Sequence, residues 1–262
     1  MISVETHPTA SEAARALGDR TRYLAGGTLV MRAVNYGDQS FDRIVHTPDP
    51  ALKEIRQEGG RLSIGAGVTM AEIIAHPNLA FLAPAARSVG GPAIRNMATV
   101  GGNLFAPHPY GDLATALLAL DASARLADGT EMPLDQLFAR RRGLPNVVLA
   151  ITLPSPAPRT FRFGKMSRVK PKGVSVMTMA VHAPSGSAPR VAYGAMADIP
   201  VRVPPVERAL AGLTSFTEAN IAPALAAATE GLDPPTDALA SAWYRREVAP
   251  VYLKRLLLGE AI

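Results

Sequence analysis

Two glycine pairs constrain the fold of this chain most strongly. One lies in AGGT at residues 25–28 and the other in TVGGN at residues 99–103. Glycine has no Cβ, so backbone N–H groups there can approach a bulky anion, and consecutive N–H groups form a nest that favours phosphate oxygens. Two such loops predict a grip on the phosphates of one dinucleotide, although either pair alone is more typical of a plain tight turn. Neither pair has Rossmann or P-loop glycine spacing, which excludes both folds.

The stretch after the second pair is rich in loop-forming residues. FAPHPYGD at 105–112 combines Pro107 and Pro109 with Gly111 and a closing Asp112. We therefore expect no helix or long strand over 98–112, and positive φ at the second glycine pair, which a β-branched residue would resist. The stretch should run extended and deliver Asp112. An alternative role for Asp112 is to cap a helix that starts at the next residue.

Capping boxes predict two helices in the first half of the chain. Thr9 with Glu12, and Thr69 with Glu72, have the spacing at which a hydroxyl and a carboxylate satisfy the first helical turn reciprocally. Two further helices are predicted at 83–89 and 113–120. Strands are predicted at 23–25, 43–46, 61–67 and 147–153, with a hairpin over 123–133 that turns at Asp128-Gly129.

The composition changes after SPAP at 155–158. Strands at 161–165, 175–182 and 190–196 predict an antiparallel sheet. An alanine-rich tail from 206 to 262 predicts helix. The layout is therefore α+β, with a mixed α/β first half and an α+β C-terminal part.

The absence of cysteine limits the chemistry that this chain can carry. None of its 262 residues is cysteine, which excludes disulfides, iron–sulfur clusters and thiolate zinc sites within it. The five histidines are scattered, so we expect no metal site and no catalytic constellation. No apolar run reaches about 18 residues, so no membrane-spanning helix is predicted.

The net charge of +5 suggests an anionic ligand or partner, and the alternative is a solvated basic face. We expect no nucleic-acid binding, because the basic clusters lack interleaved aromatic residues. A charged fraction of 19% is low, which is equally consistent with subunit contacts and with a compact monomer rich in Ala and Pro. The basic residues cluster at 140–142 and at Arg159, Arg162, Lys165, Arg168, Lys170 and Lys172.

Five motifs occur along the chain in a recognisable order. They are YLAGGTLV at 23–30, RNMATVGGN at 95–103, ALLALDA at 116–122, FRFGKMSR at 161–168 and YRREVA at 244–249. Together they resemble the FAD-binding medium subunits of the molybdenum hydroxylases, the family of xanthine dehydrogenase and aerobic carbon monoxide dehydrogenase. The resemblance covers nearly the whole chain, and the two glycine motifs are much more specific in combination than either is alone.

The resemblance implies a vanillyl-alcohol-oxidase-type (PCMH) FAD-binding domain of two α/β subdomains, residues 1–58 and 59–160. A C-terminal α+β domain, residues 161–262, would add a small antiparallel sheet and helices. One noncovalent FAD would have its pyrophosphate between the two glycine loops, with no catalytic side chain required. The cofactor-binding residues that the resemblance implies are Leu24, Ala25, Gly26, Gly27, Thr28, Leu29, Thr99, Val100, Gly101, Gly102, Asn103, His108, Asp112, Val148 and Lys165.

The resemblance also implies a role as a cytoplasmic electron-transfer subunit. Its partners would be a large subunit with the molybdenum cofactor and a small subunit with [2Fe-2S] clusters, assembled as a dimer of heterotrimers. The complex's substrate and its acceptor (NAD, quinone or oxygen) stay open. One alternative is a self-contained flavin-dependent oxidoreductase with its own substrate pocket, for which Tyr110, His108 and Lys165 are candidate acids or bases. A second alternative is a scaffold that has lost FAD.

The chain departs from the family pattern at several positions. His108 stands where serine is common, and either stacks near the flavin and tunes its potential or is an ordinary loop histidine bonded to a backbone carbonyl. Lys165 is either a cofactor contact or a surface cation. The other departures are Leu29 for an acidic residue, Asn146 for glutamate, Gly173-Val174-Ser175 for Asp-Ile-Ala, and Pro250, which is expected to interrupt the C-terminal helix.

Overall fold

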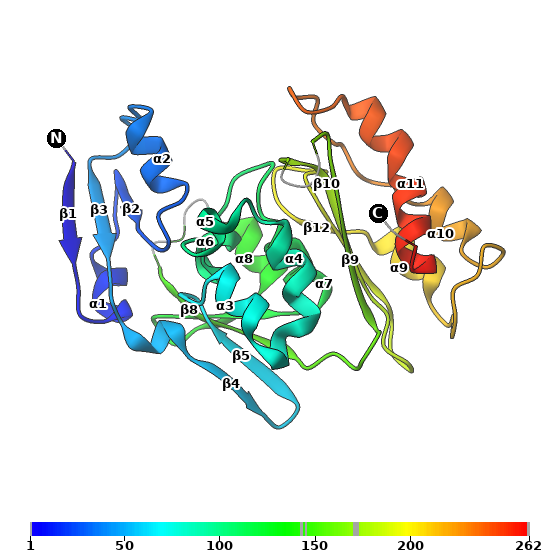
Figure 1. Ribbon diagram of the computed structural model, residues 1–262, viewed down its shortest axis with the longest axis horizontal. Helices are drawn as coiled ribbons and strands as arrows, with labels where there is room; N and C mark the ends of the chain where they lie inside the picture. The colour runs from blue at the N-terminus through cyan, green and yellow to red at the C-terminus, as the bar shows by residue number, and fades with distance from the viewer. Residues whose placement is uncertain (1, 142–143, 145, 170–172, 261–262) are drawn as a thin grey trace.

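Three β-sheets follow one another along the chain, with helices packed between and around them (Figure 1). The computed structural model describes residues 2–141, 144, 146–169 and 173–260. Arg142, Lys170, Lys172 and Ile262, which belong to the predicted basic clusters and helical tail, lie outside this part of the chain.

The first sheet is parallel and has the order β1-β3-β2. Its strands are β1 (Ser3–Thr6), β2 (Thr21–Tyr23) and β3 (Arg43–His46), with helices α1 (Ala10–Arg15) and α2 (Val30–Asn35) in the connections. The first predicted capping box is confirmed, because the Thr9 side chain accepts from the Glu12 N–H. Ala10 and Ala13 are fully buried on the inner face of α1.

The second sheet is antiparallel and has the order β4-β5-β8-β6-β7. The predicted second capping box at Thr69 and the predicted hairpin between β6 and β7 are both confirmed. The strands are β4 (Ile55–Glu58), β5 (Arg61–Gly65), β6 (Ser123–Leu126), β7 (Glu131–Pro133) and β8 (Val148–Pro154). The helices are η1 (Pro50–Lys53), α3 (Met70–Ala75), η2 (Pro77–Leu82), α4 (Ala83–Ser88), α5 (Pro92–Arg95), α6 (Val100–Leu104), α7 (Asp112–Ala119) and α8 (Leu134–Arg140).

The third sheet is antiparallel, as predicted, and has the order β12-β11-β10-β9. Its strands are β9 (Phe161–Ser167), β10 (Ser175–His182), β11 (Arg190–Gly194) and β12 (Val201–Arg202). The helices α9 (Pro204–Leu210), α10 (Ala222–Ala226) and α11 (Ala242–Leu258) follow it. All eight residues of β10 are buried, because α7 packs on one face of the sheet and α11 on the other (Figure 1).

Two hydrophobic cores meet at this third sheet. The larger core runs from α1 through the helices of the second sheet to Ala180 and Ala192, and the smaller fills the space between the sheet's other face and α9 to α11. Gly194 allows α7 to approach, since a Cβ there would overlap the hydroxyls of Thr115 and Thr178. The helix that starts at Asp112 is therefore held directly against the C-terminal sheet.

Three predictions about local structure are wrong. The segment 100–104, predicted to be loop, is the helix α6. The predicted helical tail is three separate helices joined by non-helical chain, and α11 continues through Pro250 instead of ending there. The boundaries of the three domains remain a prediction. The prediction places β4 in the first subdomain, whereas in the structure β4 pairs with β5 of the second sheet.

Candidate functional site

The first glycine motif forms an open row of backbone donors between β2 and α2. Leu24 anchors it, because its N–H donates to the Val45 carbonyl at 2.7 Å and its own carbonyl accepts from His46 Nδ1 at 3.1 Å. Among the described residues, the N–H groups of Ala25 to Leu29 have no protein acceptor. Gly27 has φ +75°, a left-handed conformation that lets the chain fold into such a nest.

The second glycine motif is a helix start, and the N–H groups of its residues 100–103 have partners within the protein. Thr99 caps α6, and its hydroxyl accepts from the Gly102 N–H at 3.1 Å. The Val100 and Gly101 N–H groups donate to the carbonyls of Val68 and Ala66, and the Asn103 N–H donates to Thr99. The expected positive φ at its glycines is wrong, whereas the role of the motif at the phosphates stays a prediction.

The fold packs the two glycine motifs directly against each other. A Cβ on Gly26 would overlap the carbonyl of Met97, and a Cβ on Gly102 would lie 3.7 Å from the Ala25 Cβ. Gly102 is half-buried, whereas Thr99, Val100, Gly101 and Asn103 are buried. The second motif therefore packs closely against the first. Gly102 is the residue of the second motif that is not buried.

Asp112 links α4 and α7 to the C-terminal sheet. Its Oδ1 accepts from Ser175 Oγ at 2.6 Å, and its Oδ2 accepts from Lys165 Nζ at 2.9 Å and from Ser88 Oγ at 3.1 Å. The cap on α7 is Gly111 and involves no side-chain hydrogen bond, so the alternative role of Asp112 as an N-cap is wrong. Asn103 braces the same helix, because its Oδ1 accepts from the Ala114 N–H at 2.9 Å.

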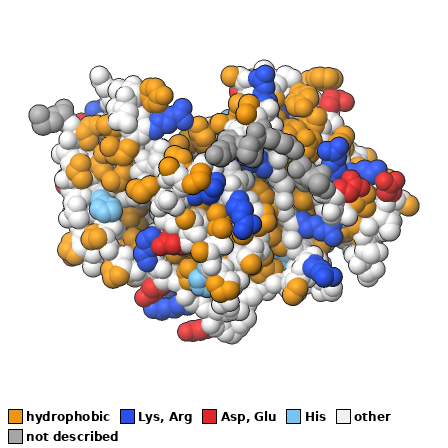
Figure 2. All heavy atoms as spheres, in the orientation of Figure 1, with side chains coloured by type: hydrophobic (Ala, Val, Ile, Leu, Met, Phe, Trp, Pro, Cys, Tyr) orange, Lys and Arg blue, Asp and Glu red, His pale blue; other side chains and the backbone are white. Residues whose placement is uncertain are grey.

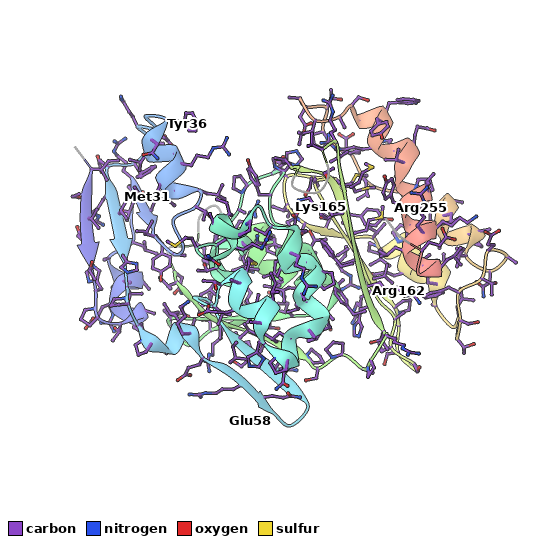
Figure 3. All side chains as sticks on the ribbon, in the orientation of Figure 1. Met31, Tyr36, Glu58, Arg162, Lys165 and Arg255 are labelled. Atoms are coloured by element: carbon purple, nitrogen blue, oxygen red, sulfur yellow. The ribbon has the colours of Figure 1, made fainter. Side chains whose placement is uncertain are left out.

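Lys165 is not a surface cation. It extends from β9 toward the helices of the second sheet (Figure 3), and its side chain is 13% exposed. Besides Asp112 it donates to the Ser88 carbonyl at 2.8 Å. Val148 is buried in β8, one residue before Leu149, whose carbonyl accepts from Ala66 behind the second motif. Both residues thus lie in the layer that supports the site.

A cavity of about 570 Å³ is lined by Arg22, Phe105, Pro107, His108, Arg141 and Asp198, none of which belongs to either glycine motif. Arg22 lies on β2 just before the first motif, and Phe105 follows α6. Arg141 fixes the cavity wall, since it donates to the carbonyls of Leu104, Ala106 and Asp198. A volume of this size is within the range of cofactor pockets.

His108 lies in this wall with an acidic partner that the sequence does not reveal. Its Nε2 is 2.8 Å from Asp237 Oδ2, and the same oxygen accepts from Arg245 Nη2 at 2.8 Å. Burial alone would raise the pKa of Asp237, but hydrogen bonds from His108, the Leu239 and Ala240 N–H groups and Arg245 hold it well below its ordinary value. His108 is thus bonded to a carboxylate, and the expected bond to a backbone carbonyl is wrong.

Four polar residues of this region were not predicted as site residues: Ser88, Asp237, Arg245 and Ser175, which was noted only as a departure from the family pattern. Arg245 stands inside the matching run YRREVA, so one signal was available. The others have no local signature, because they reach their partners only through tertiary contacts. Within the described residues, no group of three or more His, Asp or Glu side chains could hold a metal ion, and no described helix is long and apolar enough to span a membrane.

The site residues therefore fit a bound dinucleotide. A diphosphate offers only acceptor oxygens, and the five unpaired N–H groups at 25–29 offer only donors. Arg22 and Phe105, which adjoin the two motifs in sequence, line the cavity of about 570 Å³.

Comparisons with known proteins agree with this geometry. A family model described as the FAD binding domain in molybdopterin dehydrogenase matches residues 2–156, and one described as the CO dehydrogenase flavoprotein C-terminal domain matches residues 173–259. A putative xanthine dehydrogenase FAD-binding subunit of Escherichia coli is 34% identical over 128 residues, which are 45% of this chain and 43% of that protein. That alignment thus spans less than half of the relative's length.

Other similarities extend over nearly the whole chain. The 6-hydroxypseudooxynicotine dehydrogenase complex subunit alpha of Paenarthrobacter nicotinovorans is 27% identical over 92% of this chain and 86% of its own. A chain of the carbon monoxide dehydrogenase of Hydrogenophaga pseudoflava, solved without the Mo-pyranopterin moiety, superposes with a TM-score of 0.88 over 98% of this chain and 96% of its own, at 24% identity. The fold class is thereby confirmed. Since the first family model matches more than half of the residues, the chain belongs to the FAD-binding domain family of the molybdopterin dehydrogenases.

Proposed function

We propose that this chain is the FAD-binding electron-transfer subunit of a molybdenum-hydroxylase complex, and that it passes electrons from iron–sulfur clusters of a partner chain to an external acceptor. The observation that carries the proposal is the row of unpaired N–H groups at 25–29, packed against the second glycine motif. FAD, when bound, supplies the redox chemistry, whereas the chain supplies binding, orientation and electrostatics.

The residues divide into direct contacts and supports. The N–H groups of residues 25–29 would donate to the diphosphate, with the Thr28 hydroxyl as a further donor. Gly102 would let the cofactor approach, because no side chain projects from it toward Ala25. Thr99, Val100, Gly101, Asn103 and Val148 would hold this geometry from behind, since their side chains or backbone groups are buried.

The proposed partner subunits are those that would carry the other redox cofactors of the complex. It has no cysteine for iron–sulfur clusters, so a small subunit would carry the [2Fe-2S] clusters and a large subunit the molybdenum cofactor. Figure 2 shows Lys and Arg side chains among hydrophobic ones across the middle of one face, a mixed surface that suits subunit contacts. We propose a cytoplasmic dimer of heterotrimers, in keeping with the two-fold symmetry of most oligomers.

Release of a flavin from the purified full chain tests the cofactor site. The protein should show a flavin absorption spectrum, and acid precipitation should release FAD with its adenylate intact, because no covalent link is required. A well-folded chain, judged by circular dichroism, that stays colourless after incubation with FAD would contradict the proposal. Flavin that stays with the precipitate would contradict noncovalent binding.

A further inference from the structure

Helix α11 has an exposed face that carries large aromatic and apolar side chains. The helix lies at one end of the molecule, on the outer side of the third sheet (Figure 1). Trp243 is 68% exposed, Tyr244 42% and Val251 49%, whereas the opposite face of the helix packs on the smaller core. Tryptophan and tyrosine are enriched among the residues that anchor protein–protein contacts. The exposed face of α11 therefore has the composition of a docking surface.

Two charges of opposite sign lie in this exposed face. The exposed residues at intervals of three or four positions form one stripe along the helix, and they are Tyr244, Glu247, Val251 and Arg255. The other charged side chains of α11 have ion-pair partners within the chain, and they are Arg245, Arg246 and Lys254. Among the residues that the structure describes, Glu247 and Arg255 have no such partner, and the Arg255 guanidinium lies 5.6 Å from the centre of the Tyr252 ring. One acid and one base on this face are thus available to another molecule.

The two charges are placed symmetrically about Val251. Glu247 precedes it and Arg255 follows it by four residues, which is about 6 Å along the helix axis in each direction. A second α11 that runs antiparallel, with a two-fold axis at Val251, therefore places Glu247 of each copy opposite Arg255 of the other. Trp243 then lies opposite Gly259 of the other copy, which has no side chain to exclude the indole ring. A parallel pair of helices would instead place like charges opposite each other, which is unfavourable.

We propose that α11 is a self-docking surface, through which two copies of this chain associate about a two-fold axis at Val251. A contact of this kind uses the same face on both copies, so each favourable pair of residues occurs twice. One pair of helices buries less area than a standard interface, so we expect a reversible dimer at micromolar concentrations. The inference goes beyond the proposed function and does not depend on FAD binding.

Sedimentation equilibrium of the full-length protein from about 1 to about 300 µM tests the contact. The wild type should change from monomer to dimer across this range. Glu247→Arg and Arg255→Glu should each weaken the dimer about tenfold or more, because each creates two pairs of like charges. The double variant Glu247→Arg/Arg255→Glu should restore the dissociation constant to within about threefold of the wild-type value. Trp243 is the chain's one tryptophan, so its fluorescence should shift to shorter wavelength as the dimer forms.

Glu58→Arg is the matched control. It makes the same change of charge at an exposed residue on β4, far from α11 (Figure 3), and should leave the dissociation constant unchanged. A wild type that stays monomeric at every concentration would overturn the inference, as would a dimer that neither single variant weakens. Protection of Trp243 only by a different subunit would assign this face to that subunit and would also overturn the inference. FAD content, measured on the same samples, tests the proposed function separately.

Discussion

Gly101 and Gly102 are neighbours in sequence with different surroundings. A Cβ on Gly101 would lie 2.9 Å from the Ala66 Cβ and 3.1 Å from the Ala66 carbonyl oxygen, which is the acceptor of the Gly101 N–H. A Cβ on Gly102 would meet only the capping hydroxyl of Thr99 at 3.1 Å and, beyond it, the Ala25 Cβ. Gly101 therefore allows close packing against Ala66, whereas Gly102 leaves space in front of the first glycine motif.

Alanine substitutions should separate these two roles. Gly101→Ala overpacks a buried contact and should lower the free energy of unfolding by about 1–3 kcal/mol. Gly102→Ala should change it by less than about 1 kcal/mol but weaken FAD binding about tenfold, or about 1.4 kcal/mol. Urea unfolding of the apoprotein and FAD titration measure the two effects. Unchanged FAD affinity in Gly102→Ala would remove this glycine from the cofactor site.

At the scale of elements, α7 is tied to β9 by the ion pair of Asp112 and Lys165. The pair is largely buried, at 8% and 13% exposure. Removing one partner from such a pair leaves an uncompensated charge, which typically costs about 3–5 kcal/mol. Lys165→Met should therefore destabilise the chain by about this amount. The double variant Asp112→Asn/Lys165→Met should be more stable than Lys165→Met alone, because asparagine can still bond Ser88 and Ser175. Additive losses in a denaturant double-mutant cycle would show that the pair is not coupled.

Elements with local signals could be predicted from the sequence, and those set by distant partners could not. The capping boxes at Thr9 and Thr69 and the hairpin at Asp128 need only neighbouring residues. Helix α6 was missed because its first N–H groups are satisfied by carbonyls of Ala66 and Val68, far away in the chain. The site shows the same division. Its glycine motifs are local sequence patterns. The carboxylate partner of His108 is Asp237, which lies much later in the chain.

At the scale of the whole molecule, the proposed cofactor site includes residues from both sides of the junction between the two family domains. The loop from His108 to Asp112 belongs to the matched FAD-binding domain, but Asp237 and Ser175 belong to the matched C-terminal domain. Both ends of the loop are thus fixed by the C-terminal part. We therefore expect the C-terminal part to contribute to the order of this loop.

The isolated chain should be an incomplete enzyme. Among the candidate acids and bases of a self-contained oxidoreductase, Tyr110 is bonded to Arg32 at 2.8 Å, His108 to Asp237 and Lys165 to Asp112. Each of the three side chains is therefore held by a charged partner. We expect the FAD-loaded chain to oxidise no heterocycle, aldehyde or carbon monoxide in anaerobic assays that follow flavin bleaching, yet to be reduced by dithionite. Electrons from the organic substrate should reach it only when the iron–sulfur and molybdenum partners are added. Steady turnover of an organic substrate by the single chain would establish the self-contained flavoenzyme instead.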